Sequence, residues 1–260
     1  SQFIITLNAI KGYTPLEVGL MRIVFGFLVV AIITPMFADN KKIHIKWYNF
    51  AIIGFLEGTL PCVLVPWGQQ YVPSGIAAII ISTMPLFAMI FGPFIIKNEK
   101  FDMVNMASIL AGFIGVCIII NPGINNNNFL ENIIPELAIL LASASWAMSL
   151  ILIKKLPSQA PLKMTRNILF AASIEIIPIW LLLGNPSQIQ LHLIPLINAI
   201  ALGVFTSGIV YVFYVLLIRM AGVNFAAFSN YLVPIVGGII GMIFLNEHFQ
   251  LLNLVATQGM

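Results

Sequence analysis

Charged side chains are scarce in this sequence. Lys and Arg number 12 and Asp and Glu number 9 among 260 residues, so 8% of the chain is charged, against about 25% in soluble domains. The hydrophobic fraction is 60% and the mean hydropathy is +1.02. These values exclude a water-soluble globular domain. They also exclude a nucleic-acid-binding protein, despite the net charge of +3, because that function needs Lys and Arg clustered on a water-facing surface.

Cysteine and histidine are scarce too. Cys62 and Cys117 fall within apolar runs, as small buried residues do, and not in the spacing of a disulfide framework or a zinc site. Three histidines lie in loops or near the ends of apolar runs: His44, His192 and His248. We therefore expect no metal and no cofactor. Neither a nucleophile–base constellation nor the phosphate loop of an ATP-driven pump is present, so we expect a protein that is not an enzyme.

Long apolar runs make up most of the chain. A helix needs about 20 apolar residues to cross the roughly 30 Å hydrocarbon core of a bilayer. Two shorter runs, 1–10 and 251–260, predict the end of an earlier span and the start of a later one. The sequence thus predicts an all-α polytopic membrane protein with a ten-span parent fold, whose first and last spans are incomplete here. The eight complete runs are 17–36, 48–70, 74–96, 103–121, 133–153, 165–183, 195–218 and 222–245.

Positive charges alternate from loop to loop. When the loops are assigned to alternate sides, one side receives only Lys11. Because Lys and Arg mark the cytoplasmic loops of membrane proteins, the other side is predicted to be cytoplasmic, in a bacterial-type inner membrane. The residues on that side are Lys41, Lys42, Lys46, Lys97, Lys100, Lys154, Lys155, Lys163, Arg166 and Arg219.

The second half of the sequence repeats part of the first. Asn-Glu-Lys-Phe at 98–101 recurs as Asn-Glu-His-Phe at 246–249, with five predicted spans between the two motifs. Because five is an odd number, the two copies are predicted to face opposite sides. Units at 1–123 and 133–260 would then form an inverted repeat, as in alternating-access carriers. A shift of 149 also superposes Gly54, Ala77, Ala78 and Pro85 on Gly203, Ala226, Ala227 and Pro234.

Several of these features carry a family resemblance. Pro85 is followed fourteen residues later by Glu99-Lys100, and Pro234 thirteen residues later by Glu247-His248; 111–115 reads Ala-Gly-Phe-Ile-Gly, and Trp146 lies in the sixth span. This layout resembles the EamA family of the drug/metabolite transporter superfamily, ten-helix carriers built from two inverted five-helix repeats. The usual Glu-Arg pair of that family stands here as Glu-Lys and Glu-His. The resemblance implies transport of small organic metabolites through a cavity that the Trp146 helix lines.

Glu57 is the first candidate binding residue. It lies near the middle of the span 48–70, where an ionised carboxylate is costly unless it faces a cavity or a partner. Gly54, Gly58 and Pro61 lie three before, one after and four after it, which favours an irregular helix surface open to a solute. A protonated Glu57 bonded to a neighbouring helix is the alternative.

Two other charged residues lie within spans. Glu175 is surrounded by isoleucines and is expected to be structural. Arg22 lies about one and a half turns inside its helix. We expect it to be an anchor that reaches the surface, or that pairs with Glu17 or with a carboxylate of another helix, rather than a substrate contact.

A polar and aromatic stripe runs along the span 195–218. Ser207, Tyr211 and Tyr214 recur at i, i+4 and i+7, the spacing of one helix face. Ser143 and Trp146, three residues apart on another span, could face them. We expect all five to line a binding cavity, although tyrosine and tryptophan also form hydrogen bonds between packed helices.

Paired prolines predict hinges in the two halves. Pro85 and Pro234 fall within spans at equivalent positions, and paired interruptions mark the midplane binding site of many transporters. Ser82 and Asn230, which precede them, are therefore expected to contact substrate. A ridge of small residues could pack internally or support a homodimer: Ala107, Ala111 and Gly115.

Together these features predict a secondary transporter of small organic solutes, such as an amino acid, a derivative or a similar metabolite, that works by alternating access. Its partners would be that solute and the lipid bilayer. One acid beside aromatic and hydroxyl groups favours a neutral or cationic amphipathic solute. The alternative is a passive channel or a non-transporting membrane scaffold, although the sequence shows neither a carbonyl filter nor a ring of charges.

Overall fold

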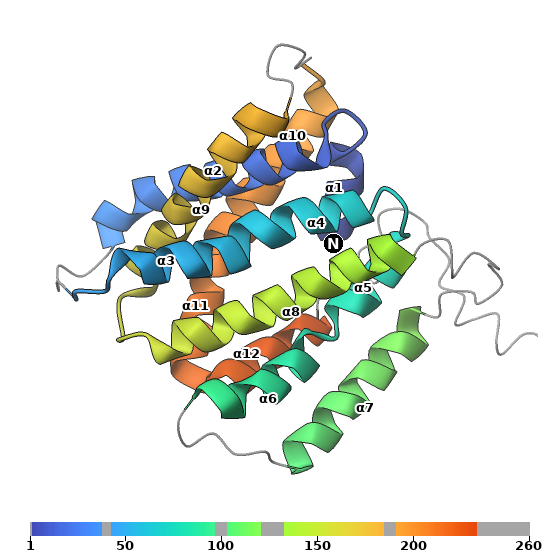
Figure 1. The fold of residues 1–260 in the computed structure, drawn as a ribbon, viewed down its shortest axis with the longest axis vertical. Coiled ribbons are helices and arrows are strands. Elements are labelled where there is room, and N and C mark those ends of the chain that lie inside the picture. The colour runs from blue at the N-terminus through green and yellow to red at the C-terminus, as the bar shows by residue number, and fades with distance from the viewer. Residues whose placement is uncertain (1, 38–42, 97–102, 121–132, 185–190, 233–260) are drawn as a thin grey trace, which may run out of the picture.

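The computed structural model describes residues 2–37, 43–96, 103–120, 133–184 and 191–232, and within them the chain forms helices and no strand (Figure 1). Six segments are long and apolar enough to cross a membrane. They match six of the eight predicted spans and confirm an all-helical, multi-pass membrane protein. These segments are α2 (Pro15–Phe37), α3–α4 (Trp47–Gly54 and Leu60–Gly68), α5–α6 (Ser74–Ile81 and Met84–Ile95), α8 (Ile133–Lys155), α9 (Pro161–Leu183) and α10–α11 (Leu193–Ala201 and Tyr211–Ala221).

Three further helices occupy the remaining predicted spans that the structure describes. α1 (Gln2–Ala9) forms the predicted helix end, and α7 (Met103–Ile120) fills the run 103–121. α12 (Val223–Phe228), continued by the 3₁₀ turn Ser229–Tyr231, begins the run 222–245. The rest of that run, the predicted helix at 251–260 and both Asn-Glu motifs lie outside the described residues.

The helix ends gather on two opposite faces. Arg219, in the last turn of α11, donates hydrogen bonds to the carbonyls of Leu156 (2.7 Å) and Pro157 (3.1 Å), just after α8. At the other end of α8, Gly68 of α4 lies against Pro135, whose carbonyl oxygen would be 3.0 Å from a Cβ at Gly68. The 23 residues of α8 span about 34 Å at 1.5 Å per residue. The ends of α4 and α11 therefore lie on opposite faces of the bundle.

The α4 end shares its face with several other helix ends. One cavity there is lined by Lys11 and Tyr13 before α2, by Trp67 of α4, by Leu183 of α9 and by His192 before α10. The backbone N–H of His192 donates to the Tyr13 hydroxyl at 3.4 Å. The start of α2, the end of α4, the end of α9 and the start of α10 therefore share one face, as the alternating directions predicted from the loop charges require for these spans.

The start of α2 is fixed by a capping box. The Glu17 carboxylate accepts hydrogen bonds from the N–H (2.8 Å) and the hydroxyl (2.9 Å) of Thr14, and the Thr14 hydroxyl accepts one from the Glu17 N–H (3.3 Å). Pro15 takes the first helical position, where no N–H is needed. Glu17 therefore serves the helix end and does not pair with Arg22.

A π-helical turn, Phe55–Thr59, separates α3 from α4. Pro61 follows it. Proline has no N–H, and its ring clashes with the carbonyl four residues earlier, which is that of Glu57. The Leu60 N–H bonds to the carbonyl five residues back, so it is not available to Leu56. The carbonyls of Leu56 and Glu57 thus lack their usual backbone donors.

Two side chains of α8 replace the missing donors. The Ser145 hydroxyl donates to the Leu56 carbonyl at 2.6 Å, and the Trp146 indole N–H donates to the Glu57 carbonyl at 2.9 Å. An unpaired backbone carbonyl within a membrane costs several kcal/mol. These two bonds therefore hold α8 against the π-helical turn.

The break between α5 and α6 uses the same device. The chain turns at Ser82, and Pro85 lies in the first turn of α6. The carbonyl that Pro85 leaves without a donor is that of Ile81, and it accepts a hydrogen bond from Ser143 of α8 at 3.2 Å. The helix is thus broken where the sequence predicts an interruption. The equivalent Pro234 lies outside the described residues.

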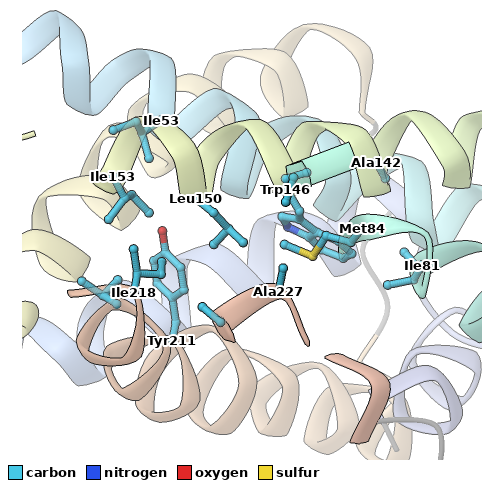
Figure 2. Close-up of a cluster of buried hydrophobic side chains, with 14 of the residues drawn as sticks. Ile53, Ile81, Met84, Ala142, Trp146, Leu150, Ile153, Tyr211, Ile218 and Ala227 are labelled. Atoms are coloured by element: carbon cyan, nitrogen blue, oxygen red, sulfur yellow. The ribbon is translucent and has the colours of Figure 1, made fainter. Parts of the chain in front are cut away.

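The helix α8 also forms the centre of the hydrophobic core. It lies between α4 and α6 (Figure 1). Its buried side chains recur at helical spacing and point toward α11, α6 and α12 (Figure 2). On the outside, large apolar side chains such as Leu182 (82% exposed) form a surface that lipid would cover. The labelled core residues of α8 are Ala142, Trp146, Leu150 and Ile153.

We predict that Trp146→Phe lowers the free energy of unfolding by about 1–3 kcal/mol, because it leaves the Glu57 carbonyl without a donor. In a Pro61→Ala background the backbone gains an N–H for that carbonyl. Trp146→Phe should therefore lower the free energy of unfolding by a smaller amount in that background. The lost ring volume is the same in both backgrounds, so their difference reports the hydrogen bond. Unfolding in mixed micelles, followed by circular dichroism, measures both. Equal costs in the two backgrounds would contradict the capping role.

Candidate functional site

A cavity of about 290 Å³ lies within the bundle. This volume is close to the lower end of the roughly 300–1,000 Å³ typical of small-molecule sites. Its walls come from α1, α2, the π-helical turn Phe55–Thr59, α4, α5, α6, α8, α9, a second π-helical segment (Leu202–Val210) between α10 and α11, α11 itself and the turn after α12. Its polar and aromatic lining residues are Gln2, Arg22, Glu57, Cys62, Trp146, Thr206, Ser207, Tyr211, Tyr214 and Asn230.

Six of the eight residues that the sequence suggests for substrate binding line this cavity. They come from four separate parts of the chain, so the fold brings them together. These residues are Glu57, Trp146, Ser207, Tyr211, Tyr214 and Asn230.

The other two, Ser82 and Ser143, are not among the cavity-lining residues. The Ser82 hydroxyl donates to the Ala78 carbonyl one turn earlier, at 2.7 Å. The Ser143 hydroxyl lies 3.2 Å from the Ile81 carbonyl and 3.1 Å from the Thr83 hydroxyl. Both serines thus satisfy the backbone and side chains at the α5–α6 break.

Glu57 faces the cavity from the π-helical turn. Its Oε2 accepts a hydrogen bond from the hydroxyl of Ser149 on α8. The same hydroxyl lies 2.8 Å from the Trp146 carbonyl. No described residue donates to the second carboxylate oxygen, Oε1. Glu57 therefore has one fixed oxygen and one that is available to a solute.

Arg22 lies inside the bundle and lines the same cavity. Its side chain is only 8% exposed. Nε donates to the Ser207 hydroxyl at 2.9 Å, and Nη2 donates to Oε1 of Gln2 at 3.3 Å. This corrects the expectation of a surface-reaching anchor, because the helix packs too closely here for the side chain to turn outward.

The sequence signal for this placement was a pair of glycines. Gly19 and Gly26 lie three before and four after Arg22, on the same helix face. A Cβ at Gly26 would be 2.9 Å from the Ser207 Cβ, and one at Gly19 would be 2.6 Å from the Cys62 carbonyl oxygen. This face of α2 is therefore pressed against other helices, and a long side chain between the glycines must enter the bundle.

Two tyrosines follow Ser207 along the same cavity wall. The Asn230 amide donates to the Tyr214 hydroxyl at 2.7 Å and approaches the Met84 sulfur at 3.4 Å. Tyr211 is 5% exposed, and its hydroxyl has no hydrogen-bond partner among the described residues. That hydroxyl points toward α8 (Figure 2). Tyr211 therefore offers an unused buried donor.

Glu175, the second acid within a span, is not among the residues that line the cavity. Its Oε2 accepts a hydrogen bond from Thr59 at 2.7 Å, at the contact of α9 with the π-helical turn. This is the structural position that the sequence favours.

Taken together, the cavity combines one base, one acid, two tyrosines, a few neutral polar side chains and a largely apolar wall. Such a surface binds a small solute through a few polar contacts and apolar packing.

Known proteins with similar sequences are described as transporters. The chain is 31% identical over 151 residues to the uncharacterized inner membrane transporter YedA of Escherichia coli (strain K12), covering 56% of this chain and 46% of that protein. It is 26% identical over 163 residues to the uncharacterized transporter YoaV of Bacillus subtilis (strain 168), covering 56% and 54%. The chain thus spans about half the length of these two relatives.

Longer matches extend over nearly the whole chain. The uncharacterized transporter YvbV of Bacillus subtilis (strain 168) is 23% identical over 253 residues, covering 94% of this chain and 79% of that protein. A solved crystal structure superposes with a TM-score of 0.72 over 93% of this chain and 87% of that chain, at 14% identity. The structural match shows a shared fold.

The family model with the description "EamA-like transporter family" matches residues 1–121 and 133–258, which is nearly the whole sequence. This match agrees with the residues that carry the resemblance. The chain belongs to the EamA-like transporter family.

Proposed function

We propose that the protein is a secondary transporter of small organic solutes that works by alternating access in a bacterial-type inner membrane. One observation carries this proposal. A largely apolar cavity with a few polar groups is lined by both halves of the chain, and the halves have equivalent spans that are interrupted at the same place.

The interruptions agree with the sequence repeat. A shift of 149 moves the π-helical turn Phe55–Thr59 onto 204–208, which lies within the π-helical segment Leu202–Val210. The same shift moves Ser74, the first residue of α5, onto Val223, the first residue of α12. π-helical segments are rare and are frequent at functional sites. Their coincidence under one shift supports a duplicated unit.

The packing of the halves is reciprocal. α2 packs on Leu202–Val210, and its counterpart α9 packs on α3 and the first π-helical turn. A Cβ at Gly203 would lie 3.0 Å from the Arg22 carbonyl, and one at the equivalent Gly54 would lie 2.9 Å from the Ala172 backbone nitrogen. Close contact at matched glycines supports a two-fold relation between the halves.

The equivalent spans also run in opposite directions, since α4 and α11 end on opposite faces of the bundle. In carriers with inverted repeats, each half can adopt the conformation of the other, which closes the site on one side and opens it on the other. The cavity draws Arg22 and Glu57 from the first half, and Ser207 and Tyr214 from the second. Such a site would change as the halves exchange conformations.

The similarity to YedA, whose name describes an inner membrane transporter, supports the membrane and the activity proposed. A passive channel or a scaffold is the rival, and it differs from a carrier in one measurable property. A carrier must return its site across the membrane, whereas an open pore has no such step.

We predict counterflow by the purified full chain in liposomes. The vesicles are loaded with unlabelled amino acids, and uptake of a radiolabelled amino-acid mixture is compared with that of empty vesicles. Unlabelled solute inside the vesicles should accelerate uptake of labelled solute, because the carrier returns its binding site to the outer surface with unlabelled solute bound. Uptake that is equal in both vesicle types would indicate a pore, and no uptake above protein-free vesicles would indicate a scaffold.

We also predict that Glu57→Gln lowers this counterflow at least about tenfold, because it removes the negative charge that faces the solute; hydrogen bonds to charged groups are worth about 1.5–3 kcal/mol. Glu175→Gln is the matched control, since Glu175 is also an acid within a span but does not line the cavity. It should keep counterflow within about twofold. Wild-type rates in Glu57→Gln, measured on protein that elutes as a single species, would remove Glu57 from the site.

A further inference from the structure

Arg22 is a buried positive charge whose hydrogen-bond partners are neutral. Among the described residues these partners are the Ser207 hydroxyl and the Gln2 side-chain oxygen. The carboxylate of Glu57 is not among these partners, and its Oε2 accepts a hydrogen bond from Ser149 instead. Taking a charge out of water costs several kcal/mol unless an opposite charge and hydrogen bonds compensate it.

The guanidinium still has unused donors. Arginine presents five N–H groups in a planar fork that matches a carboxylate, and two of its three nitrogens are engaged as described above. Nη1 has no hydrogen-bond partner among the described residues, and the side chain lines the cavity. An anionic group within the cavity could therefore accept hydrogen bonds from the unused N–H groups of Arg22.

A second charged group of the same cavity also has unused hydrogen-bonding capacity. Glu57 has one oxygen, Oε1, to which no described residue donates, while its Oε2 is bonded to Ser149. The cavity thus offers a cation and an anion, each able to form further hydrogen bonds.

We propose that Arg22 binds an anionic group of the substrate, and that the substrate is an amphoteric solute whose carboxylate lies on Arg22 and whose cationic group lies toward Glu57. This deepens the proposed function and rests on it. An amphoteric solute also replaces the neutral or cationic solute that the sequence predicted when Glu57 was the only charged group expected in the cavity. Ser207 and Gln2 are positioning residues, since their oxygens hold the guanidinium toward the cavity.

Binding to the purified full chain in detergent tests this inference separately from transport. The probes are leucine and phenylalanine, each with its amide, which lacks the negative charge, and its decarboxylated amine. Ligand binding to the folded state raises the unfolding temperature. We expect half-saturating concentrations for the amino acids at least about tenfold below those for the amides and amines, since a hydrogen bond to a charged group contributes that much or more.

The variants then assign this selectivity to Arg22. Arg22→Gln should abolish the preference for the carboxylate, whereas Arg22→Lys, which keeps the charge but not the fork, should keep part of it. The wild-type preference is informative even if a variant does not fold. Equal stabilisation of wild type by amides, amines and amino acids would overturn the inference. So would the absence of stabilisation by either amino acid, or an unchanged preference in a folded Arg22→Gln variant.

Transport of the same probes in liposomes separates the two claims. If carboxylate-selective binding is present but counterflow is absent, the proposed transport fails and the role of Arg22 stands. If counterflow occurs equally for the amines and the amino acids, the transporter stands and the role of Arg22 fails.

Discussion

The structure depends on the donation of hydrogen bonds from α8 to backbone carbonyls that prolines leave unpaired. Because Pro61 has no N–H, the Glu57 carbonyl accepts its hydrogen bond from the Trp146 indole instead. Because Pro85 has no N–H, the Ile81 carbonyl accepts its hydrogen bond from the Ser143 hydroxyl. Within lipid no water can compensate such a carbonyl. Each broken span must therefore lie where α8 can reach it, which places both breaks on one helix at the centre of the bundle.

The same constraint positions the cavity. The π-helical turn before Pro61 turns Glu57 toward the interior, where Ser149 of α8 fixes one carboxylate oxygen. Across the cavity, the close approach of α2 to Leu202–Val210 brings Arg22 onto Ser207. Opposite charges from two helices of the first half thus face one space, and Ser149 of α8 and Ser207 of the second half hold them in place rather than an ion pair between them. That arrangement leaves both charges able to bind a solute.

The sequence predicted the helices well because apolar length is a strong signal within a membrane protein. It also predicted the stripe of Ser207, Tyr211 and Tyr214, since helical spacing places them on one face. It could not tell whether a hydroxyl serves a ligand or a carbonyl, so Ser143 was expected in the cavity although it caps Ile81. The sequence predicted that Arg22 would reach the surface or pair with a carboxylate, because the sequence alone does not show that the glycine face around it is packed.

The central claim is that the two halves are inverted copies around one cavity, and cysteine labelling tests it directly. Tyr71 and Met220 are equivalent under the shift of 149, and they are 54% and 78% exposed. Each is replaced by cysteine in a Cys62→Ser, Cys117→Ser background and treated with a membrane-impermeant maleimide from either surface of the membrane. We predict that Tyr71→Cys and Met220→Cys label from opposite surfaces. Labelling of both from the same surface would contradict the inverted repeat and the alternating-access mechanism that follows from it.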